Sequence, residues 1–230
     1  MNTQKSKVSV VLPAYNEAGN IAVLLEKVQG VFIKEGLEGE VILIDDGSTD
    51  DTAKIACEYM KKIPFLKVSR HDKNLGLTKT LTEAFKNATG DIIIFLCSDL
   101  QSDPEEDIPK LLRGIDSGAD VAVGWRQGRK RFRFLGSKMF NAVSRAIFGL
   151  DVHDLNWIKA FRREAAQNLA LKSDWHRFIV PIAAHKGFKI AEVKTNWYPR
   201  KFGKSKYNLT RVPISILDMI VLKAEFMRGK

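Results

Sequence analysis

The sequence predicts an α/β protein with a mostly parallel sheet and helices on both faces of that sheet. Two observations support this fold class. Runs of Val, Ile and Leu that are typical of buried strands alternate with segments whose apolar residues recur at helical spacing. The alternation repeats at intervals of roughly 20–30 residues, as expected for right-handed βαβ units. The length of 230 residues suits a single domain.

Each strand expected in the first half of the chain is a short apolar run. The expected strands cover residues 8–12, 40–45, 65–69, 91–96 and 121–124. The segments between them have the helical period, and the expected helices cover residues 17–30, 50–62, 77–87 and 103–117. The last helix has the strongest start signal, because Asp103 can cap it, Pro104 suits its first turn and acidic residues follow.

The regular alternation stops after residue 125. Helices are expected over residues 135–148, 162–171 and 212–228, and an edge strand over residues 188–197. The sequence contains no internal repeat and no low-complexity linker. We therefore expect one domain over residues 1–230. Its expected parts are an α/β part (1–124), a basic and more irregular part (125–211) and a C-terminal amphipathic helix (212–230).

The composition is that of a folded globular protein, with 45% hydrophobic and 28% charged residues, and it excludes disorder. No apolar run reaches the roughly 18 residues that a membrane span needs. Residues 1–7 are polar and do not resemble a secretory signal. Two cysteines, Cys57 and Cys97, cannot form a disulfide framework, so a reducing, cytoplasmic setting is expected.

The formal net charge of +10 is distributed unevenly along the chain. Residues 1–100 contain 12 Lys+Arg and 14 Asp+Glu, whereas residues 101–230 contain 25 and 13. Two basic blocks without any acidic residue, 125–150 and 200–211, lie in the second part. Such blocks suggest nucleic acid, an anionic membrane surface or phosphorylated small molecules as partners, although a solvated basic face would have the same composition.

Polar motifs follow four of the expected strands, at the ends where an open parallel sheet binds its ligands. They are residues 13–17, 45–50, 97–101 and 124–126. Each motif alone could be a turn or a helix cap. Because all four fall on the same edge of the predicted sheet, together they indicate a binding site.

The chemistry of this edge is that of hard oxygen ligands. Asp99 and Gln101 suit Mg²⁺ or Mn²⁺ rather than zinc, and such an ion is usually completed by substrate phosphates. The sequence contains no Walker phosphate loop, and no Gly-x-Gly-x-x-Gly follows the first strand. The four histidines show no zinc-like spacing with the two cysteines. P-loop kinases, nicotinamide dehydrogenases and zinc enzymes are therefore disfavoured.

Several motifs resemble glycosyltransferase family 2, and more closely its dolichyl-phosphate mannose synthase and polyprenyl-phosphate glycosyltransferase branch. The resemblance covers residues 7–211 in the family's order. It is carried by residues 8–17, 44–50, 74–76, 98–105, 154–155, 160–164, 176–179 and 200–207.

This resemblance implies a GT-A fold, which is a Rossmann-like, mostly parallel sheet with a basic acceptor-side C-terminal half. It further implies an inverting, metal-dependent transfer of a sugar from a UDP- or GDP-linked donor to a polyprenyl or dolichyl phosphate. By the family pattern, residues 1–124 bind the nucleotide-sugar and residues 125–211 the acceptor and phosphates. The residues implied to line the nucleotide pocket are Pro13, Tyr15, Glu17, Ile44 and Asp46.

The family pattern also implies roles at the reacting phosphates. Asp99 and Gln101 would hold the metal, Mg²⁺ or Mn²⁺, on the donor diphosphate, within a cofactor-binding segment that includes Cys97 and Ser98. The basic residues implied to contact phosphates are Arg126, Arg177, Arg200 and Lys206. The expected catalytic residues are Asp99, Arg126 and Asp154. Asp154 is the candidate base or acceptor-orienting acid, and a helix cap is the alternative.

One position departs from the family pattern. The family's metal site usually reads Asp-Ala-Asp-Leu-Gln, whereas residues 97–101 here read Cys-Ser-Asp-Leu-Gln. A thiol is a poor ligand for Mg²⁺. The main expectation is an active enzyme that relies on Asp99 and Gln101; the alternative is a weakened or non-catalytic nucleotide-sugar binder.

The acceptor is expected at a membrane. Residues 125–148 mix cations with aromatic side chains, and residues 212–228 form an amphipathic helix, traits that interfacial segments combine. The expected partner is the cytoplasmic membrane face or a membrane-anchored protein; packing of the terminal helix on the core or on a second subunit is the alternative. A soluble saccharide or protein glycan remains a second acceptor class. Nucleic acid ranks last as a partner, because the sequence has no nucleic-acid recognition signature.

Overall fold

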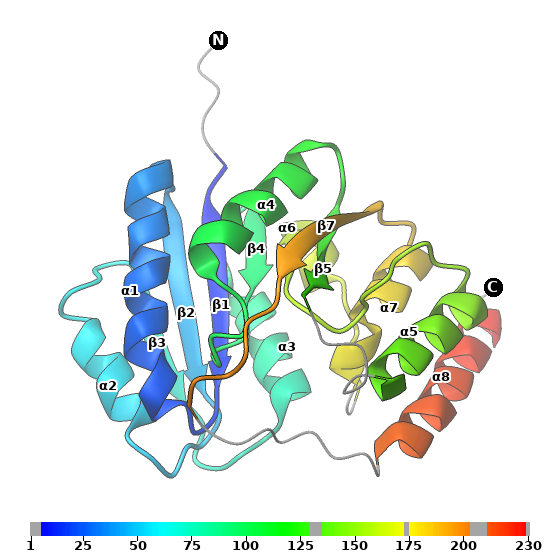
Figure 1. Cartoon of the computed structure of the whole chain (residues 1–230), viewed down its shortest axis with the longest axis horizontal. Coiled ribbons are helices and arrows are strands. Elements are labelled where there is room, and N and C mark those ends of the chain that lie inside the picture. The colour runs from blue at the N-terminus through cyan, green and yellow to red at the C-terminus, as the bar shows by residue number, and fades with distance from the viewer. Residues whose placement is uncertain (1–5, 129–134, 173–174, 203–210, 229–230) are drawn as a thin grey trace.

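The computed structural model describes residues 6–128, 135–172, 175–202 and 211–228. Its centre is a seven-stranded sheet with the strand order β3-β2-β1-β4-β6-β5-β7. The strands are β1 (Val8–Ala14), β2 (Gly39–Asp45), β3 (Leu66–Arg70), β4 (Ile92–Phe95), β5 (Val121–Gln127), β6 (Lys159–Arg162) and β7 (Ile190–Asn196). All neighbouring pairs are parallel except the two that β6 makes with β4 and β5. The predicted mostly parallel α/β sheet is therefore confirmed (Figure 1).

The helices cover both faces of the sheet, as predicted. They are α1 (Ala18–Glu35), α2 (Thr52–Tyr59), α3 (Leu77–Asn87), α4 (Pro104–Asp116), α5 (Leu135–Phe148), α6 (Arg163–Gln167), α7 (Ile179–His185) and α8 (Arg211–Arg228), with a 3-10 helix at Trp175–Phe178. Helices α1, α2 and α4 pack on one face, and α3, α6, α7 and α8 contribute to the core on the other. The predicted helix over 135–148 agrees with α5, and 212–228 agrees with α8 to within one residue.

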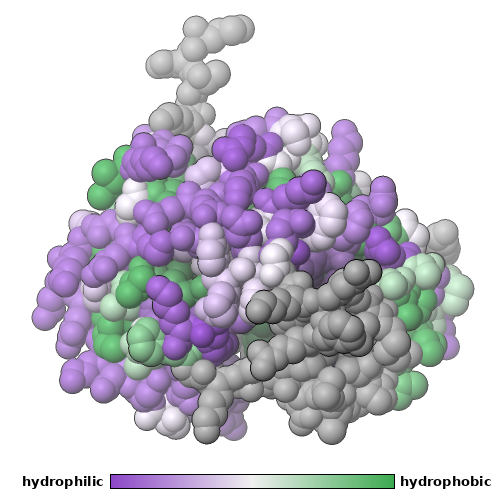
Figure 2. All heavy atoms as spheres, viewed as in Figure 1, coloured by the Kyte–Doolittle hydropathy of each residue, from purple (hydrophilic) through white to green (hydrophobic). Residues whose placement is uncertain are grey.

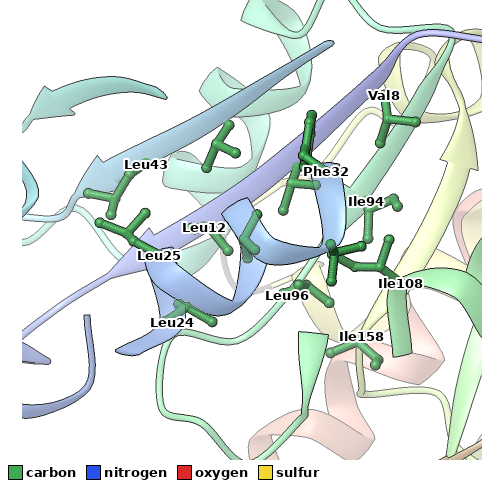
Figure 3. Packing of buried hydrophobic residues seen from close by; sticks show 14 of the residues in the cluster. Val8, Leu12, Leu24, Leu25, Phe32, Leu43, Ile94, Leu96, Ile108 and Ile158 are labelled. Carbon is green, nitrogen blue, oxygen red and sulfur yellow. The ribbon is translucent and has the colours of Figure 1, made fainter. Parts of the chain in front are cut away.

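Two buried clusters, one on each face, hold the helices on the sheet. Alternate residues of β1 point to opposite faces, so that Leu12 lies in one cluster and Val11 in the other. Figure 3 shows the first cluster, in which Leu25 of α1 lies beside Leu43 of β2, and Phe32, farther along α1, lies on the side of Val8 and Ile94. This packing fixes the start of α1, and with it the loop that follows β1.

Several predicted boundaries were wrong. Helix α1 continues past residue 30 and ends at Gly36, which adopts a left-handed conformation and donates to the carbonyl groups of the last turn. Strand β5 extends to Gln127, because its whole length pairs with β7; residues 124–126 are therefore inside the strand rather than after it. The helix expected over 162–171 is only α6, and α7 was not predicted.

Strand β6 was missed because its four residues, Lys-Ala-Phe-Arg, contain no β-branched residue and begin and end with a cation, unlike the equally short but apolar β4. It runs antiparallel between β4 and β5, with Lys159 opposite Phe95 on one side and Val123 on the other. Its insertion separates β5 from β4 in the sheet.

The described helices include none that is long and apolar enough to cross a membrane.

Candidate active site

The loops after β1 and β2 interlock at the carboxyl edge of the sheet. The N–H of Asn16 donates to Ser48 Oγ (2.8 Å), and Asn16 Oδ1 accepts from the N–H of Thr49 (2.8 Å). The N–H of Glu17 donates to Thr52 Oγ1 (2.8 Å) at the start of α2. Asn16 has a left-handed backbone (φ 56°), a conformation that Asn tolerates better than most residues. The predicted motifs 13–17 and 45–50 are thus brought together.

The two aspartates of the second motif organise this edge differently. Asp45 is fully buried and accepts a hydrogen bond from the Ser48 hydroxyl, so it closes its own turn. Asp46 reaches across to the loop before α3, where it accepts from the N–H groups of Leu75 (2.8 Å) and Gly76 (2.9 Å). Gly47, which follows Asp46, must remain a glycine, because its φ is +71° and a Cβ would lie 2.4 Å from the Lys73 carbonyl carbon.

His71 lies between Asp46 and the exposed carboxylate of Glu83. Its Nδ1 is 2.8 Å from Asp46 Oδ1, and its Nε2 is 3.0 Å from Glu83 Oε2. Burial disfavours the charged ring, but the hydrogen bonds to the two carboxylates outweigh it and raise the pKa of His71. His71 therefore ties Asp46 to Glu83 at the edge of the site.

The expected metal-binding segment is tied to β1 and to a distant arginine. Ser98 Oγ donates to the carbonyl oxygen of Pro13 (2.8 Å), and Asp99 Oδ1 accepts from the N–H of Gln101 (3.1 Å). Arg200 bridges two carboxylates: Nη2 to Asp99 Oδ2 (2.7 Å) and Nη1 to Glu17 Oε1 (3.1 Å). The segment after β7, drawn in orange in Figure 1, returns across this edge and carries Arg200 to it.

Arg126 and Asp154 form the second charged pair of the site. Arg126 Nε and Nη2 donate to Asp154 at 2.5 and 2.7 Å, and the two side chains are only 9% and 6% exposed. The guanidinium also lies 4.6 Å from the centre of the Trp157 ring. Arg126 points from β5, whereas Asp154 comes from the segment between α5 and β6.

Sequence reasoning missed Lys159, which is 1% exposed and lies on β6. Its Nζ donates to the Trp157 carbonyl oxygen (2.6 Å). Burial lowers the pKa of Lys159 to about 8, and the charge of Asp154 offsets only part of that shift. Because β6 was not predicted, no pattern in the sequence placed this cation beneath the site.

Cys97 lies near the charges of Asp99, Arg126, Lys159 and Arg200. Cys97 is half-buried and packs against both core clusters. Desolvation, together with the Asp99 carboxylate, raises the pKa of the thiol to about 12. Cys97 is therefore a neutral thiol at physiological pH.

The remaining predicted residues are distributed around these groups. Pro13 is on β1 opposite Ile44 of β2, and the Ile44 side chain is fully buried in the core. Tyr15 is half-buried in the loop after β1. Arg177 is in the 3-10 helix beside His176, which contacts Thr78 Oγ1 (2.9 Å) at the start of α3. Lys206 lies outside the described residues.

The oxygen donors of the 97–101 segment are too few to hold a divalent cation by themselves, so the ion would need further ligands from the substrate. Asp99 and Gln101 supply one carboxylate and one amide, and the protonated Cys97 thiol adds no hard ligand. Within the described ranges, no group of three or more His, Cys, Asp or Glu residues could hold a metal ion. A Mg²⁺ or Mn²⁺ ion that takes its other ligands from phosphate oxygens and water is compatible with this set.

Comparison with known proteins identifies the family. Residues 9–178 match the model of glycosyl transferase family 2, and the chain belongs to that family. The chain is 33% identical over 218 residues to the undecaprenyl-phosphate 4-deoxy-4-formamido-L-arabinose transferase of Klebsiella pneumoniae subsp. pneumoniae (93% of this chain, 66% of the relative). It is 32% identical over 235 residues to the dodecaprenyl-phosphate galacturonate synthase of Rhizobium johnstonii (99% of this chain, 69% of the relative). The chain thus spans about two thirds of the length of these relatives.

Solved structures agree on the fold. Glucosyl-3-phosphoglycerate synthase from Mycobacterium tuberculosis, in complex with Mn²⁺, UDP and glucosyl-3-phosphoglycerate, superposes with a TM-score of 0.75 at 21% identity. The match covers 95% of this chain and 80% of that chain. The expected GT-A fold is confirmed.

Lys159→Met is expected to raise the free energy of unfolding of the protein at neutral pH. A buried ammonium opposes folding, so at pH 7 the variant should have a free energy of unfolding about 1–3 kcal/mol higher than the wild type. Folded Lys159 loses its proton near pH 8 and the unfolded side chain near 10.5, so the unfolded wild type binds more protons in that window. Between pH 8 and about 10.5, the free energy of unfolding of the wild type should therefore rise relative to that of the variant, so that the difference between the two proteins becomes smaller.

Urea unfolding at pH 7 and at pH 10 measures this difference, with exposed Lys54→Met on α2 as the control. A Lys159→Met variant that is less stable at pH 7 would contradict the assignment.

Proposed function

We propose that this protein transfers a sugar from a UDP- or GDP-linked donor to a polyprenyl phosphate, with inversion at the anomeric carbon. The observation that carries the proposal is the pairing of both expected catalytic carboxylates with arginines at the carboxyl edge of the sheet, Asp99 with Arg200 and Asp154 with Arg126. The family and the polyprenyl-phosphate specificity named for two relatives support the substrate class.

In the proposed reaction, an oxygen of the acceptor phosphate attacks the anomeric carbon opposite the nucleotide diphosphate. A new carbon–oxygen bond forms as the bond to the diphosphate breaks, and the diphosphate leaves with the bonding electrons. Arg126 and Arg200 stabilise the negative charge that develops there. Arg200 can do so by turning from Asp99 and Glu17 toward the phosphates. Residues 1–124 bind the donor, and residues 125–211 the acceptor.

Asp99 and Gln101 would hold Mg²⁺ or Mn²⁺, which when bound neutralises charge on the donor diphosphate. Asp154 orients the acceptor and takes a proton from its phosphate when that phosphate arrives protonated; a phosphate monoester is already largely anionic near pH 7 and needs little of this help. The departure at Cys97 motivates the alternative of a weakened or non-catalytic nucleotide-sugar binder, and an assay with several acceptors separates the two.

The test incubates labelled UDP- and GDP-sugars with Mn²⁺ or Mg²⁺ and with polyprenyl phosphate, an oligosaccharide or water. Label in the lipid fraction supports the proposal. Label in the oligosaccharide would assign a soluble acceptor instead. Donor binding without turnover under any condition would support the non-catalytic alternative.

We propose that α8 helps the protein reach this acceptor at the cytoplasmic face of an anionic membrane. Met219 and Leu222 of α8 are buried in the core, whereas Leu217, Ile220 and Val221 on its other side are 51–62% exposed. Figure 2 shows hydrophobic residues at the margin where Figure 1 places α8. The net positive charge of residues 101–230 would add electrostatic attraction.

Sedimentation with phosphatidylglycerol vesicles should recover the wild type, and Ile220→Asn should weaken recovery. If neutral phosphatidylcholine vesicles at high salt recovered as much wild-type protein as phosphatidylglycerol vesicles do, a role for charge would be contradicted.

Cys97→Asp should strengthen the metal site. A carboxylate there would add a hard ligand, and the nearby cations Arg126, Lys159 and Arg200 would offset its repulsion with Asp99. We expect half-maximal activity at an about 10-fold lower Mn²⁺ concentration, with a rate equal to or above that of the wild type. A Mn²⁺ titration of activity measures this, with exposed Cys57→Asp as the control. Complete loss of activity in a folded Cys97→Asp protein would show that the neutral thiol is required.

A further inference from the structure

A carboxylate on the edge strand lies behind the Asp154–Arg126 pair. Glu192 of β7 accepts two backbone hydrogen bonds through Oε1, from the N–H of His153 (2.7 Å) and from the N–H of Asp154 (3.0 Å). Its Oε2 is 2.7 Å from His153 Nδ1. The Glu192 side chain is only 12% exposed. Glu192 thus holds the backbone of Asp154, the residue that pairs with Arg126, and both the backbone and the ring of the preceding His153.

The segment that carries Asp154 needs such a support. It lies between α5 and β6 and forms neither a helix nor a strand. A bidentate carboxylate–guanidinium pair tolerates little displacement of either partner, because both hydrogen bonds depend on the relative angle of the two groups. The backbone around residue 154 must therefore be fixed from outside the segment.

Strand β7 holds both members of the Arg126–Asp154 pair in place. Arg126 of β5 is opposite Thr195 of β7, and Val123 of β5 is opposite Glu192. Glu192 then ties the Asp154 backbone to the same strand pair. Hydrogen bonds to an ionised acceptor are about twice as strong as neutral ones, which suits this task.

Two other contacts also hold the segment that carries Asp154, but they do not substitute for Glu192. Asn141 of α5 donates to the His153 carbonyl oxygen (3.0 Å), and the His153 ring stacks on Trp125 with 4.0 Å between centroids. Both contacts hold His153 and do not hold the N–H of Asp154. Glu192 alone joins both successive N–H groups among the contacts of the described residues.

We propose that Glu192 is a positioning residue that sets the orientation of Asp154 toward Arg126 and the acceptor. This inference rests on the proposed function, because it assigns Asp154 a role in transfer. Glu192 acts through the backbone and needs no contact with substrate.

The test compares Glu192→Ala, Glu192→Gln and Glu192→Asp with the wild type in the transfer assay. Glu192→Ala should lower kcat about 10- to 100-fold, the usual cost of losing a supporting contact behind a site, with donor KM changed less than about 3-fold. Glu192→Gln should recover most of the rate, because an amide oxygen can accept both N–H bonds. Exposed Glu58→Ala on α2 is the matched control and should behave as the wild type.

A double-mutant cycle with Asp154→Asn separates positioning from a general structural role. If Glu192 acts through Asp154, Glu192→Ala should lower the residual kcat of Asp154→Asn by less than about 2-fold. Fully additive losses, or a loss in KM alone, would overturn the proposal. Should Glu192→Ala not fold, Glu192→Asp, whose carboxylate is withdrawn by one methylene, provides the same cycle.

Backbone hydrogen exchange gives a readout that does not depend on turnover. Residues 151–156 should exchange faster in Glu192→Ala, while β7 stays protected. Unchanged exchange there would overturn the proposal even if activity fell. An inactive wild type would instead refute the proposed function, and the exchange result would still decide whether Glu192 holds the segment.

Discussion

Replacing Asp99 by Ala is expected to abolish metal-dependent transfer, with kcat/KM lowered about 10³-fold or more. Asp99 is the only carboxylate in the Cys97–Gln101 segment, because Cys97 is a neutral thiol. A metal ion contributes several kcal/mol of charge stabilisation at a transferring phosphate, which corresponds to a loss of this size. The same substitution also removes one of the two carboxylates that Arg200 bridges.

Initial rates across a Mn²⁺ titration measure the effect, together with Mn²⁺ binding by electron paramagnetic resonance in the presence of donor. Asp99→Asn preserves volume and should fail similarly. Asp51→Ala, an exposed carboxylate that makes no capping hydrogen bond at the start of α2, should have no effect. Full activity in Asp99→Ala would rule out the metal assignment.

Replacing Asp154 by Asn is expected to lower kcat about 10²- to 10⁴-fold, the range associated with a positioned acid–base group. Stability should fall as well. Arg126 is 9% exposed, and removing one partner of a buried ion pair costs about 3–5 kcal/mol because the other charge stays buried.

The double substitution Arg126→Met/Asp154→Leu separates these two effects. Removing both charges should restore part of the free energy of unfolding, since Arg126 is no longer buried without its partner, but should leave transfer impaired. The recovery should be incomplete, because Lys159 loses the opposing charge of Asp154. Urea unfolding and transfer rates of the three proteins provide the comparison. Recovery of activity along with stability would mean that the pair serves folding alone.

The sequence predicts the first half of the sheet better than the second half. Strands β1, β2 and β4 are buried apolar runs, and the polar motifs that follow them converge as expected because parallel strands share one edge. The start of α4 also agrees, since Asp103 caps it by accepting from the N–H of Glu105. These features depend on local pattern, which the sequence displays directly.

The contacts that complete the site depend on distant residues and could not be predicted. Arg200 meets Asp99 across 101 positions, and Glu192 meets Asp154 across 38. The four residues of β6 form no apolar or β-branched run, in contrast to the equally short β4, so Lys159 was missed with them. The resemblance to the family named Arg200 as a phosphate ligand, but only the structure shows which carboxylates it bridges.

The chemical identity of the product tests the central claim most directly. Polyprenyl phosphate, the cognate nucleotide-sugar and Mn²⁺ are incubated with the protein, and the lipid fraction is analysed by mass spectrometry and NMR. We expect polyprenyl phosphate carrying one sugar, with an anomeric configuration opposite to that of the donor, and no such lipid with Asp99→Ala. Free sugar alone, or a lipid product of unchanged configuration, would contradict it.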